Sequence, residues 1–560
     1  MSALSLAEEL IHRHPRGVGG VLAGCAAAYL AMTFAVPLCV RGLYANDMNQ
    51  NLAWAHRLGD PTLFSSAAAI AYEDYFYGRP GMRAIYGTLL HVADLELSAK
   101  LLSLALGAAL LAIAYATGKH LGGGRRAAGA IGALALCMMF RPADLNIWAA
   151  LHGGLPRSLG LALTMLGFSA AIAWRWWLFG VVLLAAGLVY PPAFALLSAT
   201  GGARLLFEWR RAIAESRSSV LLLALFGVAS AALVLALYGR AAPAEIGPPV
   251  TFTEALHMPA LRPGGLAPLL VKDTPLGCIL GTGFGFTPTL AVALATLGSA
   301  SLLVRPRSDR LRDAGRAALA LAVAGVLCHA AAYLFFFKLY HPMRYIAFSI
   351  PFAIWILAAQ VALALSERVT ISPLARARFT RNIGRGAAVA AVAFLAFCAF
   401  NLYRISPRGF DAGHTGLYRS PVTRAMCDAI EWLPKDALIA AHPDGAGDVQ
   451  FLCRRGVLVQ ADGLYPYRAK HFAAMHARML AVTAALYATD WAPIQRLHER
   501  YGVDYFLVNH NSFRPDYSAW SDSYPELRVP DAGGKRFVLL EPAADRVVAA
   551  DGDLVLVSLR

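Results

Sequence analysis

The sequence predicts a polytopic α-helical membrane protein of about 11 transmembrane helices, followed by a C-terminal extracytoplasmic α/β domain. Hydrophobic residues make up 58% of the 560 residues and charged residues only 15%, whereas a soluble domain has roughly 25% charged residues. Long, nearly uncharged stretches recur at lengths that suit a bilayer crossing of about 20 residues. From residue 404 onward the composition changes, and helix and strand patterns alternate.

The apolar runs define the predicted spans. They are 17–40, 98–118, 127–140, 157–173, 176–190, 193–207, 219–238, 286–304, 317–337, 346–365 and 387–403. The first run is longer than a signal-peptide core of about 7–15 residues, so we expect an uncleaved first span. The stretch 176–207 is divided because the pair Pro191–Pro192 cannot continue a helix.

The distribution of basic residues predicts the orientation. The net charge is +15, and Lys and Arg concentrate in short segments between spans, such as 119–126 and 305–316. The positive-inside rule assigns these segments to the cytoplasm. We therefore expect a multi-pass protein of the inner (plasma) membrane with a cytoplasmic N-terminus and an outside C-terminal part. Basic loops between apolar runs favour this interpretation over nucleic-acid binding.

Two domains follow from this layout. Residues 1–403 form the transmembrane domain, with a long first outer loop at 41–97, and residues 404–560 form the periplasmic α/β domain. In the second domain we expect helices at 423–436, 467–488 and 492–503, and strands at 437–443, 454–462, 504–510, 535–542 and 554–559. Cys427 and Cys453 lie in this domain and can pair if it is extracytoplasmic, so their pairing stays open.

The first outer loop opens with a carboxylate among amides. Asp47 comes six residues after Arg41 and is followed by Asn49, Gln50 and Asn51. On a helix through 46–58 the polar side chains largely share one face, and such a helix can lie along the membrane surface. The polar face would then line a lumen above the bundle. The alternative is an interfacial helix with a solvated Asp47.

Three further outer segments carry candidate residues. Glu73 and Asp74 lie among four tyrosines with Arg79 and Arg83 nearby. This set suits a sugar, because aromatic rings stack on sugar rings and carboxylates bind sugar hydroxyls. The alternative is an amphipathic segment that lies on lipid headgroups. The segment 141–156 contains Asp144, Trp148 and His152. The segment 338–345 contains Lys338, His341 and Arg344, which suit a lipid phosphate or ordinary snorkelling to headgroups.

Taken together, these residues resemble the GT-C superfamily of membrane glycosyltransferases, which use polyprenyl-phosphate-linked sugars. The resemblance rests on the acid of "ANDMNQ", which is Asp47, on the late outer turn "HPMRY", which contains Arg344, and on the layout of loops and C-terminal domain. The second acid of the family is matched by Glu73, Asp74 or Asp144, which stay open. The chain has "ND" where the family's simplest signature has an adjacent acidic pair, and its C-terminal part has no WWDYG-like motif. The missing motif argues against an oligosaccharyltransferase and leaves the acceptor open.

The resemblance implies an inverting glycosyltransferase that moves a sugar from a polyprenyl-phosphate-linked donor to an extracytoplasmic glycan, lipid or protein acceptor. Asp47 would be the general base, and Arg344, with Lys338 and His341, would hold the donor phosphate. The substrate-binding candidates are Asn51, Tyr75, Arg79, Trp148 and His152. No metal-ligand cluster stands out; a divalent ion, Mg or Mn, stays open.

Two other classes remain. The first is a transporter or flippase for a lipid-linked glycan, which would place ionisable groups at mid-membrane and often shows inverted repeats. The informative acids of this sequence lie outside the spans, and no repeat is visible, which favours the enzyme. The second is a non-catalytic membrane protein that presents its C-terminal domain to partners.

Overall fold

The computed structural model describes most of the chain. The described residues are 2–13, 15–45, 47–137, 151–238, 242–263, 269–281, 288–304, 306, 308–339, 341–372, 396, 417–464, 466–515, 517, 524–531 and 536–560. The predicted span 387–403 and the site candidates Asp144 and Trp148 therefore lie outside the described residues, apart from Ala396.

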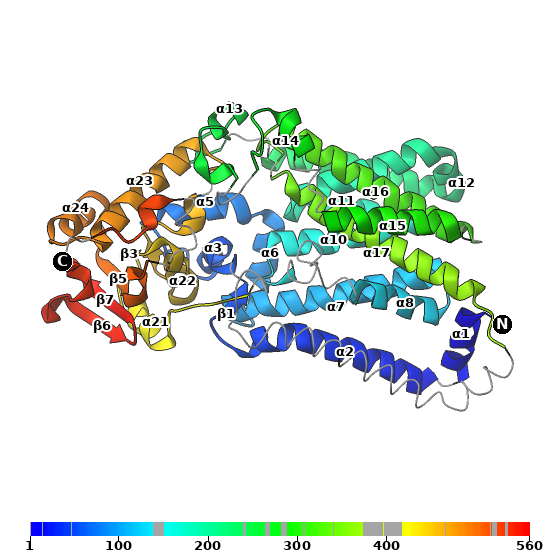
Figure 1. Cartoon of the computed structure of the whole chain (residues 1–560), viewed down its shortest axis with the longest axis horizontal. Coiled ribbons are helices and arrows are strands. Elements are labelled where there is room, and N and C mark those ends of the chain that lie inside the picture. Colours follow the sequence, from blue (N-terminus) through cyan, green and yellow to red (C-terminus); the bar gives the residue numbers. More distant parts are fainter. Residues whose placement is uncertain are drawn as a thin grey trace.

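Long helices run side by side along the long axis of the molecule (Figure 1). The helices of this bundle are α2 (Pro15–Cys39), α7 (Leu95–Leu121), α8 (Arg126–Cys137), α10 (Pro156–Ile172), α11 (Trp176–Val189), α12 (Pro191–Tyr238), α15 (Pro288–Val304), α16 (Asp309–Leu334) and α17 (Met343–Arg368). The short helix α1 (Ala3–Arg13) crosses the end of the bundle near the N-terminus. The N-terminus lies at one end of the bundle and the C-terminal sheet lies beyond the other end.

Four helices of the described part are long and apolar enough to cross a membrane. They are Leu95–Leu121, Val220–Leu237, Asp309–Leu334 and Met343–Arg368, and four shorter apolar helices accompany them. Leu221, Leu225 and Leu235 are 64% to 71% exposed, which suits contact with lipid and not with water. The mainly helical fold with a C-terminal sheet is thus confirmed, whereas the predicted count of about 11 spans is not.

The chain reverses direction after α11 and again within the segment assigned as α12. Tyr190 is extended and separates α11 from α12, as Pro191 and Pro192 predict. Gly187 of α11 then lies against both Phe194 and Val234. In a straight helix these two residues would be about 60 Å apart at 1.5 Å per residue. The segment assigned as α12 must therefore fold back on itself, and its two arms correspond to the predicted spans 193–207 and 219–238.

The segments that the charge pattern assigns to the cytoplasm gather at one end of the bundle. Arg125 forms an ion pair with Glu367 at 3.3 Å, and Nη1 of Arg310 donates to the carbonyl oxygen of His120 at 3.4 Å. The first outer segment and the C-terminal sheet lie at the opposite end (Figure 1). The alternation of loops between the two ends thus follows the predicted order, while the side of the membrane that each end faces stays a prediction.

Short elements cover the outer end of the bundle. They are β1 (Leu43–Ala45), α3 (Met48–Asn51), η1 (Ala53–Ala55), α4 (His56–Gly59), α5 (Ala68–Tyr77), α6 (Pro80–Leu89), α13 (Phe252–Ala255), η3 (Pro259–Leu261) and α14 (Pro275–Gly281). β1 pairs antiparallel with β2 (Leu417–Arg419), with Tyr44 opposite Tyr418. This two-stranded sheet joins the first outer segment to the C-terminal part of the chain.

The C-terminal part, called here the C-terminal unit (residues 417–560), contains a five-stranded sheet in the order β4-β3-β5-β7-β6. β3 runs parallel to β4 and β5, and β7 runs antiparallel to both of its neighbours. The elements are α21 (Arg424–Glu431), β3 (Leu438–Ala441), α22 (Pro443–Cys453), β4 (Gly456–Val457), η5 (Ala461–Leu464), α23 (Ala469–Leu486), α24 (Ala492–Tyr501), β5 (Tyr505–Asn509), η6 (His510–Phe513), η7 (Pro525–Leu527), η8 (Val538–Leu540), η9 (Ala544–Arg546), β6 (Val547–Asp551) and β7 (Leu554–Ser558).

Most predicted elements of this unit are present, with one exception. The strand expected at 535–542 is wrong, because Val538–Leu540 forms a 3₁₀ helix whose first N–H donates to the carbonyl oxygen of Ala488. The edge strand β6 (Val547–Asp551) was not predicted; its side chains alternate between half-buried and exposed. Cys427 and Cys453 form a disulfide that joins α21 to the end of α22, which answers the question that the sequence leaves open.

Candidate functional site

Asp47 lies at the outer end of the bundle, directly before α3. Its Oδ2 accepts a hydrogen bond from Nη1 of Arg157, at the start of α10, and its side chain is 32% exposed. Its backbone carbonyl accepts from Nδ2 of Asn51 at 2.8 Å. Asp47 therefore presents a partly exposed carboxylate whose direction is set by a cation from a different helix.

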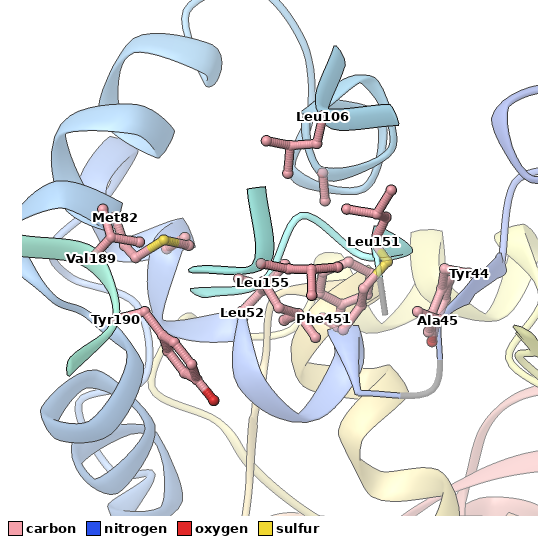
Figure 2. Packing of buried hydrophobic residues seen from close by; sticks show 14 of the residues in the cluster. Tyr44, Ala45, Leu52, Met82, Leu106, Leu151, Leu155, Val189, Tyr190 and Phe451 are labelled. Atoms are coloured by element: carbon pink, nitrogen blue, oxygen red, sulfur yellow. The ribbon is translucent and has the colours of Figure 1, made fainter. Parts of the chain in front are cut away.

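The amides that follow Asp47 are buried by protein, whereas the position of this segment relative to the membrane surface stays a prediction. Asn49, Gln50 and Asn51 are 1%, 6% and 7% exposed, and Trp54 is 1% exposed. The cause is tertiary, because α22 of the C-terminal unit packs against α3. Figure 2 shows the apolar packing beside this helix, where Leu52, Leu155 and Phe451 meet.

A small polar cavity lies next to this segment. It is lined by Gln50, Asn51, Ala69, Tyr72, Glu73, Tyr77, Gln460 and Gly463. Glu73 of α5 is 2% exposed, and its Oε1 accepts a hydrogen bond from Nε2 of Gln460. Of the predicted residues, Asn51 and Glu73 are therefore brought together, and the C-terminal unit contributes Gln460, which the sequence did not single out.

Asp74, the neighbouring acid, has a different environment. Its Oδ1 accepts from Nη2 of Arg83, whose Nε also donates to the carbonyl of Gly78 at 2.8 Å. Asp74 does not line the polar cavity. Its contacts close the turn between α5 and α6, and the choice of second acid among Glu73, Asp74 and Asp144 stays a prediction.

Tyr75 and Arg79 contact each other and the C-terminal unit. The guanidinium carbons of Arg79 and Arg468 lie 5.6 Å and 5.7 Å from the centroid of the Tyr75 ring. Tyr72 stacks on His471 with 3.9 Å between ring centroids. Cation–π contacts of this kind contribute about 0.5–1 kcal/mol at exposed sites, so this aromatic cluster ties α5 to α23.

His152 lies in a second small cavity that shares no lining residue with the first. Its ring is 5.0 Å from that of Phe34, and the cavity is also lined by Met48 and Lys100. Burial lowers the pKa of His152 to about 4, so it is neutral at pH 7. The structure thus separates His152 from Glu73, with α3 between them.

The late basic turn presents two cations and a neutral histidine. Lys338 is exposed. Arg344 belongs to the first turn of α17, and its N–H donates to the carbonyl of His341 at 3.1 Å. Burial, with a contribution from the charge of Arg344, lowers the pKa of His341 to about 3. His341 therefore carries no charge at pH 7, in contrast to the expectation that it helps to neutralise a phosphate.

The late turn and the first outer segment touch one common segment of the C-terminal unit. The ring of Tyr467 lies 4.6 Å from that of Phe337 in the late turn. The adjacent Arg468 lies over Tyr75. Residues 467 and 468 therefore lie between the two candidate regions, although the predicted convergence of Asp47 and Arg344 on one pocket stays a prediction.

Asp448 of α22 is a buried carboxylate that sequence reasoning missed. It is 0% exposed and accepts four hydrogen bonds from side chains. The donors are Tyr44 at 2.5 Å, Asn49 at 2.7 Å, Ser420 at 2.7 Å and Tyr418 at 2.9 Å. Burial raises the pKa of Asp448, and these hydrogen bonds oppose the rise. An isolated acid in a helix gives no local signal of such contacts.

Among the described residues, no three His, Cys, Asp or Glu side chains gather in a way that could hold a metal ion. The described candidate acids face other groups: Asp47 faces Arg157, Glu73 faces Gln460, and Asp74 faces Arg83. The Mg or Mn ion that the sequence left open is therefore not assigned to these residues.

No family model and no curated protein matches the chain. Solved structures do. The oligosaccharyltransferase of Archaeoglobus fulgidus in its apo form has 13% identity, over 91% of this chain and 72% of that chain, with a TM-score of 0.47. The archaeal oligosaccharyltransferase AglB from the same organism, in complex with an inhibitory peptide and a dolichol-phosphate, has 14% identity over 92% and 72%, with a TM-score of 0.40.

These neighbours belong to the superfamily that the sequence resembles. A third, the Archaeoglobus fulgidus oligosaccharyltransferase complex with Zn and sulfate, has 14% identity over 90% of this chain and 69% of that chain, with a TM-score of 0.41. Likenesses at these TM-scores carry no argument about the chemistry of this chain, which rests on its own residues.

Proposed function

We propose that this chain is an integral membrane glycosyltransferase that moves a sugar from a polyprenyl-phosphate-linked donor to an acceptor outside the cytoplasm. The observation that carries the proposal is the placement of Asp47. It is a partly exposed carboxylate at the outer end of the bundle, oriented by Arg157 and next to the polar cavity of Glu73, Asn51 and Gln460.

The reaction would be a single displacement at the anomeric carbon, with inversion of configuration. Asp47 would accept the proton of the acceptor hydroxyl while the oxygen of that hydroxyl forms a bond to the anomeric carbon. The bond between that carbon and the donor phosphate oxygen breaks, and the phosphate leaves with its electron pair. Arg344 and Lys338 would stabilise its growing charge, a contribution that is often the larger one.

The polar cavity has room for about one water molecule or one hydroxyl group, and its lining favours a polar occupant over an apolar one. It is lined by two carboxamides of α3, a third carboxamide from Gln460, the carboxylate of Glu73 and two tyrosines. Such groups bind the hydroxyls of a sugar ring through directed hydrogen bonds. We assign Asn51 and Glu73 to substrate binding, whereas Tyr75 and Arg79 hold the neighbouring aromatic cluster together.

The orientation proposed for the chain places the C-terminal unit outside the cytoplasm. The disulfide between Cys427 and Cys453 supports it, because disulfides persist in oxidising compartments and are rare in the cytosol. The donor phosphate would then lie in the outer leaflet beside Arg344.

The proposal is tested by the substitution Asp47→Asn in purified protein reconstituted into proteoliposomes. A positioned base contributes about 10²–10⁴-fold, so transfer from a radiolabelled polyprenyl-phosphate-linked hexose should fall by that factor. Asp60→Asn is the matched control, since Asp60 lies in the same outer loop but forms a surface ion pair with Lys435. Wild-type transfer by the folded Asp47→Asn protein would remove Asp47 from the reaction.

A further inference from the structure

We infer that Asp448 is a positioning residue that holds the Asp47-bearing segment in its active geometry. The inference rests on the proposed function and extends it to the C-terminal unit. It makes this unit an integral part of the site, because its buried carboxylate sets where the first outer segment lies.

The four donors to Asp448 come from both sides of the junction between the first outer segment and the C-terminal unit. Tyr44 and Asn49 belong to the first outer segment, and they stand three residues before and two residues after Asp47. Tyr418 and Ser420 belong to β2 and the residue that follows it. Oδ1 of Asp448 accepts from Tyr44 and Asn49, and Oδ2 accepts from the other two donors. Asp47 is therefore flanked on either side by side chains that donate to one carboxylate oxygen.

The helix that carries Asp448 is itself firmly held. The disulfide fixes its last residue, Cys453, to α21. A ring nitrogen of His56 lies 2.8 Å from the carbonyl oxygen of Phe451. At Gly447 the helix has no side chain, and a Cβ there would lie 2.9 Å from Oε1 of Gln460 and 3.3 Å from Cγ of Asn49. The surface of α22 at Gly447 thus allows the close approach of Gln460, which donates to Glu73, and of Asn49, which lies two residues after Asp47.

The charge on Asp448 matters for this role. Hydrogen bonds to an ionised acceptor are roughly twice as strong as those between neutral groups, and a carboxylate has enough acceptor sites for four donors. An amide at this position has one acceptor oxygen and brings two donors of its own. Catalysis is sensitive to small displacements, since an error of about 1 Å can cost about 10²-fold in rate.

The experiment compares four variants of the full chain in proteoliposomes. Asp448→Asn removes the carboxylate. Asn49→Ala removes a donor that lies in the Asp47 segment, while Tyr418→Phe removes a donor that lies in β2. Asp551→Asn is the control, because Asp551 accepts from Thr423 within the C-terminal unit. The readouts are kcat and KM with a radiolabelled polyprenyl-phosphate-linked hexose, and hydrogen exchange of a peptide covering residues 43–52.

Positioning predicts a specific pattern. Asp448→Asn and Asn49→Ala should lower kcat by about 10- to 100-fold, change KM by less than about threefold, and speed amide exchange in peptide 43–52. Tyr418→Phe and Asp551→Asn should change kcat by less than about threefold. If Asp448→Asn unfolds the C-terminal unit, the comparison of Asn49→Ala with Tyr418→Phe decides the question.

Two outcomes overturn the inference. One is a folded Asp448→Asn or Asn49→Ala protein whose kcat and exchange match those of Asp551→Asn. The other is an equal loss of kcat in Tyr418→Phe and Asn49→Ala, which would indicate general destabilisation. If the wild-type chain transfers no hexose, the proposed function fails separately. The exchange rates of peptide 43–52 then decide the positioning role alone: faster exchange in Asn49→Ala than in Tyr418→Phe supports it, and equal rates overturn it.

Discussion

Arg204 and Asp313 form an ion pair that is 1% and 4% exposed, with 2.8 Å between Nη2 and Oδ1. Nε1 of Trp174 donates to the second oxygen of Asp313 at 2.7 Å, and Nη1 of Arg204 donates to the carbonyl of Ala171. Asp313 therefore joins α12, α16 and the turn after α10 at the end opposite the candidate site. Such a pair costs desolvation to form, but breaking it leaves an uncompensated buried charge.

The substitution Arg204→Met should therefore destabilise the protein by about 3–5 kcal/mol. Arg312→Met, which breaks the exposed pair with Asp309, should cost about 0–1 kcal/mol. Thermal unfolding in matched detergent checks the difference. A double variant, Arg204→Met with Asp313→Leu, should recover much of the loss; failure to recover would show that the charge pair is not its source.

At the scale of elements, helices α7 and α8 pack through glycine. A Cβ on Gly132 would lie 2.6 Å from the carbonyl oxygen of Ala114 and 2.9 Å from the Cα of Gly118. The carbonyl of Gly132 also accepts from Nε1 of Trp355 at 2.9 Å. Small residues allow helix backbones to approach closely in membranes, where the packing itself supplies much of the association energy.

Gly132→Ala should therefore separate α7 from α8 and destabilise the bundle by about 1–3 kcal/mol, the usual cost of overpacking. Gly298 of α15 is the control, since a Cβ there meets nothing within 4 Å. Gly298→Ala should be neutral or stabilising by up to about 1 kcal/mol. The free energies of unfolding of the two variants provide the check, and equal effects would contradict the packing argument.

At the scale of the whole molecule, buried neutral histidines lie at the junction between the first outer segment and the C-terminal unit. Burial lowers the pKa values of His56, His442 and His471 to about 4. His56 contacts Phe451, His442 begins α22, and His471 stacks on Tyr72. The unfolded chain binds protons at these sites near the usual pKa of about 6.5, whereas the folded chain does not.

The junction should therefore lose stability as pH falls from about 6.5 to about 4, because the unfolded state binds more protons over that window. Each histidine contributes up to about 3 kcal/mol of this loss. Thermal melts of the wild-type protein and of the His442→Asn variant between pH 7.5 and pH 4.5 measure this loss of stability. Asn keeps a cap for α22 but does not titrate, so its melting temperature should depend less on pH. An unchanged slope would exclude His442 as a source.

The sequence was enough to predict the helical class of the protein, the turn at Pro191–Pro192 and most elements of the C-terminal unit. It also singled out Asp47 as a candidate site residue. Each depends on signals within a few residues: long apolar runs, proline geometry, the spacing of apolar side chains, and an acid directly after a span. Glu73 was also within reach, although the sequence could not separate it from Asp74 because both share one local pattern.

Only the tertiary structure decided which of these side chains are buried together. Asp448 and Gln460 lie about 400 residues from Asn49 and Glu73, their partners in the first outer segment, and no local pattern encodes such a partner. The burial of α3, the separate cavity of His152 and the neutral state of His341 have the same origin. Local sequence determines which elements form, whereas desolvation and hydrogen bonding depend on what the rest of the chain places against them.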